Sequence, residues 1–150
     1  MHKSHYILIL LLAMVSCRYF DKKEKTNPNL LIQELQRTDQ AFSDFSKTHG
    51  MRKAFMEFIE DDGVMMRDNS MPLRGAPAIE YITNMNDSAV VLTWEPLGGD
   101  VAASGELGYT YGIYELKDSV NIQKGSYVTI WKKKDGKWKF VLDSGNQGLE

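Results

Sequence analysis

The chain is poor in the residues that most often carry nucleophilic or metal chemistry. Its 150 residues include one cysteine and three histidines, and His2 and His5 both lie at the extreme N-terminus. A chain with one cysteine forms no internal disulfide, and structural zinc sites are built from several cysteine and histidine ligands. We therefore expect no metal ion in this protein.

Motifs that bind cofactors are also missing. The sequence has no Gly-x-x-x-x-Gly-Lys phosphate loop, no Gly-x-Gly-x-x-Gly fingerprint and no Gly-x-Ser-x-Gly nucleophile elbow. Its formal net charge of −2 lacks the basic excess that nucleic-acid binding requires. We expect neither a cofactor nor a nucleic-acid partner, which leaves carboxylates, tyrosines and arginine to carry any chemistry.

The N-terminal segment has the three parts of a secretory signal. Lys3 supplies the charge, a ten-residue apolar run follows at residues 6–15, and the small Ser16 precedes Cys17. The run is too short for a membrane-spanning helix, which needs about 20 residues. The context Met-Val-Ser-Cys resembles the lipobox of bacterial lipoproteins, in which the signal is removed and the new N-terminal cysteine is acylated.

This motif implies a chain of three parts. They are a signal peptide at residues 1–16, the acylated Cys17 with a charge-rich tether at residues 17–27, and one domain at residues 28–150. A lipid then holds the protein at the bacterial cell envelope, on the outer-membrane or periplasmic side, and the anchor uses the only thiol. The alternatives are an ordinary signal with a cysteine near its end, or an uncleaved N-terminal anchor.

Apolar residues at helical spacing predict three helices in the first part of the domain. Leu31, Leu35 and Phe42 share one face of a helix across residues 28–49, which Gly50 ends. The other elements expected in this part are a short helix from residue 51 to the Asp-Asp-Gly turn at 61–63, a strand at 64–67 and a third helix opening at 75–77.

From residue 89 the apolar period changes from about 3.6 to 2, which is typical of strands. We predict strands at 90–103 (bent around 96–99), 107–116, 125–133 and 138–143. Helices followed by a run of strands indicate an α+β fold, and glycines within the strands indicate strong curvature. The predicted order is α-α-β-α-β-β-β-β, with a cone-shaped, curved antiparallel sheet packed against three helices and hollow at its mouth.

Aromatic side chains dominate one face of two successive strands. Tyr109 and Tyr111 share a face of one strand, and Tyr127 and Trp131 share a face of the next. Such faces line a small-molecule pocket, fill the core, or form an interface between subunits. Tyrosines that point toward the helices would indicate a pocket, and tyrosines that point away would indicate an interface.

Two aspartates lie beside apolar patterns. Asp39 flanks the apolar stripe of the first helix, three residues before Phe42, and is either half-buried at a pocket or in water. Asp143 alternates with Val141 in the last strand, on the side away from Phe140. An acid on the less apolar face of a strand is expected in solvent.

Several short motifs stand out along the domain. They are FIEDDGVM at 58–65, PLRG at 72–75, AI at 78–79, LTWEPL at 92–97, GYTYG at 108–112 and WKFVLD at 138–143. Together they resemble the nuclear transport factor 2-like superfamily, in its SnoaL-like branch, from about residue 31 to 146. The resemblance implies a cone of curved antiparallel sheet and three helices, often dimeric through the sheet, with a pocket inside.

The superfamily includes steroid isomerases, dehydratases, polyketide cyclases and members that only bind or scaffold. In the isomerases a catalytic aspartate lies on the first strand, and the corresponding count reaches Arg67 here, with Asp68 one step further. Phe42 or Ser43 stands near the place of the oxyanion-binding tyrosine. These departures argue against isomerase activity. Arg67 would instead favour a carboxylate or another anion, or pair with nearby acids.

We therefore expect a membrane-anchored homodimer that binds a small apolar or amphipathic molecule without catalysis. The residues expected to line its pocket are Arg67, Trp94, Tyr109, Tyr111 and Tyr127. One alternative is an isomerase-, dehydratase- or cyclase-like enzyme that uses Asp39 or Asp68 as base and a tyrosine as acid. The other is a dimeric module that binds protein through its aromatic sheet face.

Overall fold

A computed structural model describes residues 27–149 of the chain. The signal segment at residues 1–16, Cys17 and most of the tether lie outside the described residues, so the predictions about them stay predictions. Among the described residues, no helix is both long enough and apolar enough to cross a membrane.

The first two helices form as their sequences predict. Helix α2 (Pro28–His49) begins after Asn27, whose side chain accepts a 3.0 Å hydrogen bond from the backbone N–H of Asn29. Gly50, with a φ of 91°, ends α2 and lets the chain turn directly into α3 (Met51–Phe58). The helices predicted from periodicity are therefore confirmed, and so is the third, α4 (Ala76–Thr83).

Six strands form one curved, open sheet. They are β1 (Ile59–Met66), β2 (Leu73–Arg74), β3 (Val91–Val101), β4 (Leu107–Lys117), β5 (Ile122–Lys134) and β6 (Lys137–Leu149). Their order is β2-β1-β6-β5-β4-β3. All neighbours are antiparallel except β1 and β6, which run parallel. The predicted α+β class is confirmed, whereas the expectation of a purely antiparallel sheet is wrong, because β6 returns beside β1 in the same direction.

The predicted element order lacks β2, and the last strand, predicted at 138–143, extends to Leu149. The predicted boundary between the second helix and the first strand is also wrong. The Asp-Asp-Gly stretch at 61–63 lies inside β1 rather than ending a helix, since the strand already begins at Ile59. The pairing with β6 is irregular between Ile59 and Val64, and a Cβ on Gly63 would lie only 2.5 Å from Cγ1 of Ile59. The turn-like residues therefore form an irregular stretch of strand in which the backbone folds close to a side chain.

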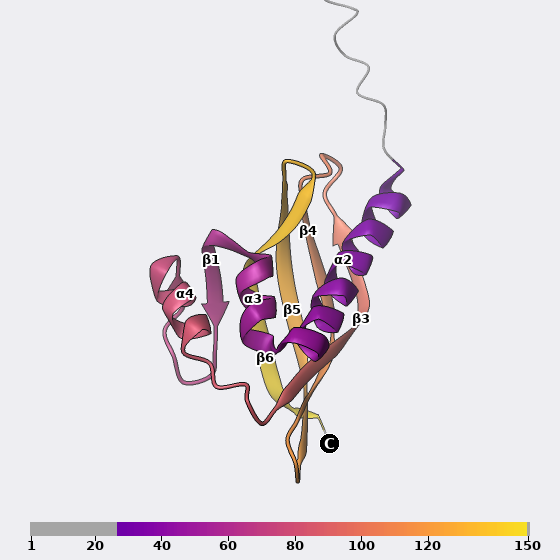
Figure 1. Cartoon of the computed structure of the whole chain (residues 1–150). Helices are drawn as coiled ribbons and strands as arrows, with labels where there is room; N and C mark the ends of the chain where they lie inside the picture. Colours follow the sequence, from indigo (N-terminus) through magenta and orange to yellow (C-terminus); the bar gives the residue numbers. More distant parts are fainter. Residues whose placement is uncertain (1–26, 150) are drawn as a thin grey trace, which may run out of the picture.

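Helices α2 and α3 cover one face of the long strands, while α4 lies beyond β1 at the edge of the sheet (Figure 1). Phe42 of α2 occupies the middle of the core, with five aromatic rings within 6.1 Å between centroids. These rings belong to Phe55, Phe58, Trp94, Trp131 and Phe140. The aromatic cluster joins both helices to three strands, and it forms the wall from which the site is built.

Candidate functional site

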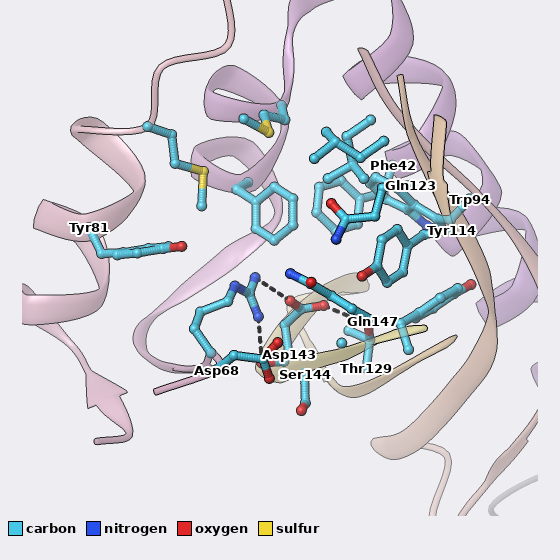
Figure 2. A pocket seen from close by; sticks show the side chains of 18 residues that line it. Phe42, Asp68, Tyr81, Trp94, Tyr114, Gln123, Thr129, Asp143, Ser144 and Gln147 are labelled. Atoms are coloured by element: carbon cyan, nitrogen blue, oxygen red, sulfur yellow. Dashed lines mark hydrogen bonds and ion pairs between the residues drawn. The ribbon is translucent and has the colours of Figure 1, made fainter. Parts of the chain in front are cut away.

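A cavity of about 350 Å³ lies between the helices and the inner face of the sheet. Most of its wall is apolar and is formed by Phe42, Met51, Phe55, Met85, Leu92, Trp94 and Leu116. Figure 2 shows Tyr81 of α4 on one side of the space and Tyr114 of β4 on the other. This volume lies within the range of small-molecule sites, which is roughly 300–1,000 Å³.

One end of the cavity is polar. Asp143 of β6 binds Arg67 there, with 2.6 Å between Oδ1 of the carboxylate and Nη2 of the guanidinium. The Thr129 hydroxyl donates a 2.9 Å hydrogen bond to the other carboxylate oxygen. Ser144 and Gln147 lie beside this pair in Figure 2 and complete the polar end.

An irregularity in β6 explains why Asp143 lies inside. Strict alternation from Phe140 would place Asp143 on the outer face, and we expected it in solvent for that reason. The β5–β6 pairing shifts by one residue, because Ile130 faces Leu142 while Trp131 faces Phe140. This bulge moves Asp143 to the inner face, where its side chain is only 11% exposed. The expectation of a solvated Asp143 is wrong.

Arg67 reaches the cavity, but its charge is not free. The Arg67 side chain is 21% exposed, and its guanidinium donates to Asp143 twice, at the carboxylate and at the backbone carbonyl. It also lies over the ring of Phe55, with 5.6 Å between Cζ and the ring centroid. Of the two alternatives for Arg67, pairing with an acid is therefore the one that the geometry favours.

Asp39 is a second internal carboxylate, behind the cavity wall. It has no exposed surface, and it accepts 2.8 Å hydrogen bonds from the Trp94 indole N–H and the Tyr127 hydroxyl. Burial raises the pKa of Asp39 from 3.8 to about 6, although the hydrogen bonds from Trp94 and Tyr127 lower it in part. Both expectations for Asp39, half-buried at a pocket or in water, are wrong, because the whole carboxylate is buried between α2 and the sheet.

The five residues expected to line a pocket divide between the two faces of the sheet. Arg67, Trp94 and Tyr127 line the cavity, whereas Tyr109 and Tyr111 are 45% and 48% exposed on the outer face. The inner positions of β4 next to these tyrosines are held by the small residues Gly108, Thr110 and Gly112. A Cβ at Gly112 would lie 2.9 Å from the Tyr127 ring, and one at Gly108 would lie 2.7 Å from Leu35.

These two close approaches give the physical reason for the correction. The space inside this part of β4 is filled from neighbouring elements, so Tyr109 and Tyr111 point outward. The period of the strand was predicted correctly, but the face that meets the helices was not. Whether Arg67, Trp94 and Tyr127 bind a ligand stays a prediction.

Asp68 and Tyr114 are two further polar residues that line the cavity. Asp68, an outside candidate for a base, lines the cavity and remains exposed. Tyr114 also lines it, and sequence reasoning missed this residue because it lies on the opposite side of β4 from Tyr109 and Tyr111. The sequence feature that could have indicated an inward Tyr114 is Gly125, which lies opposite it on β5. A Cβ at Gly125 would lie 2.5 Å from the Tyr114 ring.

Within residues 27–149, no three His, Cys, Asp or Glu side chains are grouped so that they could hold a metal ion. Phe42 and Ser43, which stand near the place of the oxyanion-binding tyrosine of the isomerases, both have structural roles. Phe42 lines the cavity as an apolar residue, and the Ser43 hydroxyl accepts the backbone N–H of Trp94 at 2.8 Å. The side chains at these two positions therefore serve packing and the attachment of α2 to β3.

Neither a protein-family model nor a curated protein matches this sequence. Solved structures do resemble it. An NTF2-like protein of unknown function from Pseudomonas putida KT2440 has a TM-score of 0.65 at 11% identity, over 81% of this chain and 89% of the other. An LEH-like epoxide hydrolase from M. tuberculosis has a TM-score of 0.56 at 14% identity, over 82% and 83%.

The association domain of C. elegans CaMKII is a third similar structure, with a TM-score of 0.56 at 15% identity, over 76% of this chain and 93% of the other. These likenesses confirm the fold that the sequence motifs suggested. The chain has the NTF2-like fold, with helices against one face of a curved open sheet. Proteins with this fold include enzymes and oligomerisation domains, so the fold by itself does not determine the function.

The buried Asp39 gives a testable pH dependence. The folded chain holds this proton more tightly than the unfolded chain, so the group stabilises the fold below pH 3.8, and that contribution is lost as the pH rises through about 6. The difference between the pKa of Asp39 in the unfolded chain, 3.8, and in the folded chain, about 6, corresponds to about 3 kcal/mol of unfolding free energy. We expect the unfolding free energy of Asp39→Asn, minus that of the wild type, to rise by about 2–3 kcal/mol from pH 4 to pH 7.5 in urea titrations. A difference that stays constant over this range would contradict the assignment.

Proposed function

We propose that this chain is a small-molecule-binding domain whose ligand occupies the cavity between the helices and the sheet. One observation carries the proposal: the cavity of about 350 Å³ is apolar along its wall and polar at one end. A site of this kind orients a ligand through a few polar contacts while apolar burial supplies most of the affinity. The ligand class is therefore a compact molecule with an apolar body and one polar group.

The polar end is suited to a hydrogen-bonding group rather than to a free anion. Asp143 already neutralises Arg67, and the Thr129 hydroxyl donates its hydrogen bond to the same carboxylate. A second anion at this position would compete with a hydrogen-bonded pair that is largely removed from water, which is costly. These contacts support a ligand that approaches the pair with a donor or with a neutral group.

A catalytic role is the second candidate function, and the hydrogen bond between Tyr127 and Asp39 favours it. Tyr127 lines the cavity, and its hydroxyl donates to a carboxylate whose pKa is raised by burial. Asp39 itself lies behind the wall, so it would act on a bound molecule only through Tyr127. An isomerase-, dehydratase- or cyclase-like reaction with Asp68 as base is the other form of this hypothesis, since Asp68 lines the cavity.

The outer face of the sheet supports the proposal of a homodimer. The large apolar side chains exposed there include Leu107, Tyr109, Tyr111, Ile113 and Val128. The partner strand positions put Tyr111 opposite Val128 and Tyr109 opposite Ile130, so the exposed residues form one continuous patch. Contiguous apolar patches of this kind are typical of association surfaces. The similarity to association domains supports a second copy of the chain as the occupant.

We also propose that the domain is held at a bacterial envelope membrane through lipid on Cys17. The support is the sequence Met-Val-Ser-Cys after a ten-residue apolar run. One acyl chain binds a membrane only weakly, whereas several chains on one cysteine hold firmly. The ligand would then be a molecule that reaches the compartment outside the cytoplasm.

The binding proposal predicts that the neutral probe 2-phenylethanol enters the cavity. We expect a dissociation constant on the order of a millimolar, measured by NMR titration. This affinity corresponds to roughly 0.5 kcal/mol per heavy atom, between the roughly 0.3 and 1.5 kcal/mol per atom of drug-sized and very small ligands. Gly145→Leu should abolish binding, because a Cβ at this cavity-lining position fits 3.4 Å from the Tyr114 ring and the rest of the leucine fills the space. Asn146→Leu places the same side chain at the next, exposed position and should leave binding unchanged.

The dimer proposal predicts that Tyr111→Lys converts a dimer into a monomer in analytical ultracentrifugation. The new charge would be buried against a second copy, which is unfavourable unless it is paired. Val120→Lys is the matched control, because Val120 is 84% exposed in the β4–β5 connection and lies outside the patch. A wild-type monomer at all concentrations, or a dimer that Tyr111→Lys leaves intact, would contradict the proposed interface.

For the anchor, Cys17→Ser should release the protein from the membrane fraction, because serine offers no thiol for acylation. The measurement is fractionation of expressing bacteria, with mass spectrometry of the mature N-terminus. Ser16→Ala is the control and should keep the protein attached, since a small residue still precedes the cysteine. Membrane retention of Cys17→Ser would show that the segment acts as an uncleaved anchor.

A further inference from the structure

The charges that line the cavity are unbalanced. One arginine and two aspartates contribute to its wall, Arg67, Asp68 and Asp143, so their formal sum is −1. Arg67 and Asp143 compensate each other at 2.6 Å. Among residues 27–149, Asp68 takes part in no ion pair, and neither lysine nor histidine lines the cavity. The excess negative charge of the site therefore belongs to Asp68.

The tyrosines inside the cavity are affected by this negative charge. Burial raises the pKa of Tyr114, and the carboxylate of Asp68 raises it further, with Arg67 opposing the effect more weakly. Burial also raises the pKa of Tyr127, and the charge of Asp39 comes next among the causes. Two phenol groups on different strands thus lie in an environment that disfavours a further negative charge.

The wall of the cavity is also rich in aromatic rings. Six rings line it, those of Phe42, Phe55, Tyr81, Trp94, Tyr114 and Tyr127. Tyr81 and Tyr114 lie on opposite sides of the space in Figure 2, so a molecule in the middle would meet rings from both α4 and the sheet. The faces of aromatic rings attract cations, and this effect is strongest where water is excluded.

Arg67 already makes a cation–π contact with the aromatic wall. The guanidinium of Arg67 lies 5.6 Å from the centroid of the Phe55 ring, at the same end of the cavity as Asp68. A ligand ammonium group of similar charge would find rings on its sides and the carboxylate of Asp68 within the same wall. An anion would find no unpaired positive charge among the residues that line the cavity.

From the aromatic wall and the unpaired Asp68, we propose that the ligand is an organic monocation, an amine or ammonium group on a compact apolar body. This inference rests on the proposed function, because it names the ligand class of the same cavity. The apolar body lies against Phe42, Leu92 and Trp94, and the ammonium group lies at the end that carries Asp68. The pairing of Arg67 with Asp143 argues against the anion that Arg67 suggested from the sequence.

Three probes of nearly equal size test the charge preference. They are 2-phenylethylammonium, 2-phenylethanol and phenylacetate, titrated into the protein at pH 7.5 and followed by calorimetry and NMR. We expect the ammonium to bind about 5–10-fold more tightly than the alcohol, and phenylacetate to bind more weakly than the alcohol. Gly145→Leu should abolish binding of all three, which places them in the cavity.

Asp68→Asn tests the origin of the preference. Asp68 is exposed, so the substitution should leave the fold intact, and the ratio between ammonium and alcohol should fall to within about twofold. Asp61→Asn removes the same charge from an exposed position of β1 that does not line the cavity, and it should leave the ratio unchanged. Far-ultraviolet circular dichroism of both variants checks that they are folded.

The outcomes separate this inference from the function on which it depends. If the alcohol and the ammonium bind equally and Gly145→Leu abolishes both, the cation preference is wrong and the binding function stands. The same conclusion follows if phenylacetate binds most tightly. If Asp68→Asn keeps the full preference for the ammonium, Asp68 is not its source, and the inference drawn from the unpaired Asp68 is wrong while the binding function stands. If none of the three probes binds, the proposed binding function fails and the inference fails with it.

Discussion

The attachment of helix α2 to the inner face of the sheet is the constraint on which the rest of the structure depends. This face of α2 is not simply apolar. Asp39 accepts hydrogen bonds from Trp94 of β3 and Tyr127 of β5, and the Ser46 hydroxyl donates to the backbone carbonyl of Leu92 at 2.8 Å. Because polar groups buried in this way must be paired, the contacts fix both the position and the rotation of the helix. Once α2 is fixed, Trp94 and Tyr127 stand as one wall of the cavity.

Some aromatic residues belong both to the packed core and to the wall of the cavity. Phe42 packs against rings of both helices and the sheet, and it also lines the open space. A packed core would ordinarily fill a gap of this size, since unfilled space costs stability. Asp39 adds to the cost, because its carboxylate is desolvated at neutral pH. Features that lower stability without a packing reason are typical of sites that serve function.

Charge distribution then decides what the cavity suits. Arg67 and Asp143 neutralise each other at the polar end, and Asp68 adds a net negative charge to the cavity lining. The outer face of the same sheet is different in character, with Tyr109 and Tyr111 exposed beside aliphatic side chains. The inner face of the sheet thus borders a cavity whose lining carries a net negative charge, and the outer face is apolar; the two faces support different proposals, ligand binding inside and association outside.

The sequence by itself determined the helices, most strands, the α+β class and the NTF2-like resemblance, because these follow from local periodicity, caps and turns. It also grouped Arg67, Trp94 and Tyr127 in one pocket, but together with Tyr109 and Tyr111, which lie on the outer face. It could not decide which face of β4 meets the helices, since that depends on Leu35 and Tyr127 filling the space over its glycines. Nor could it place Asp143, whose side follows from a one-residue shift between β5 and β6. Register and burial arise from packing between distant segments, and for this reason only the tertiary structure decided where the charges of the site lie.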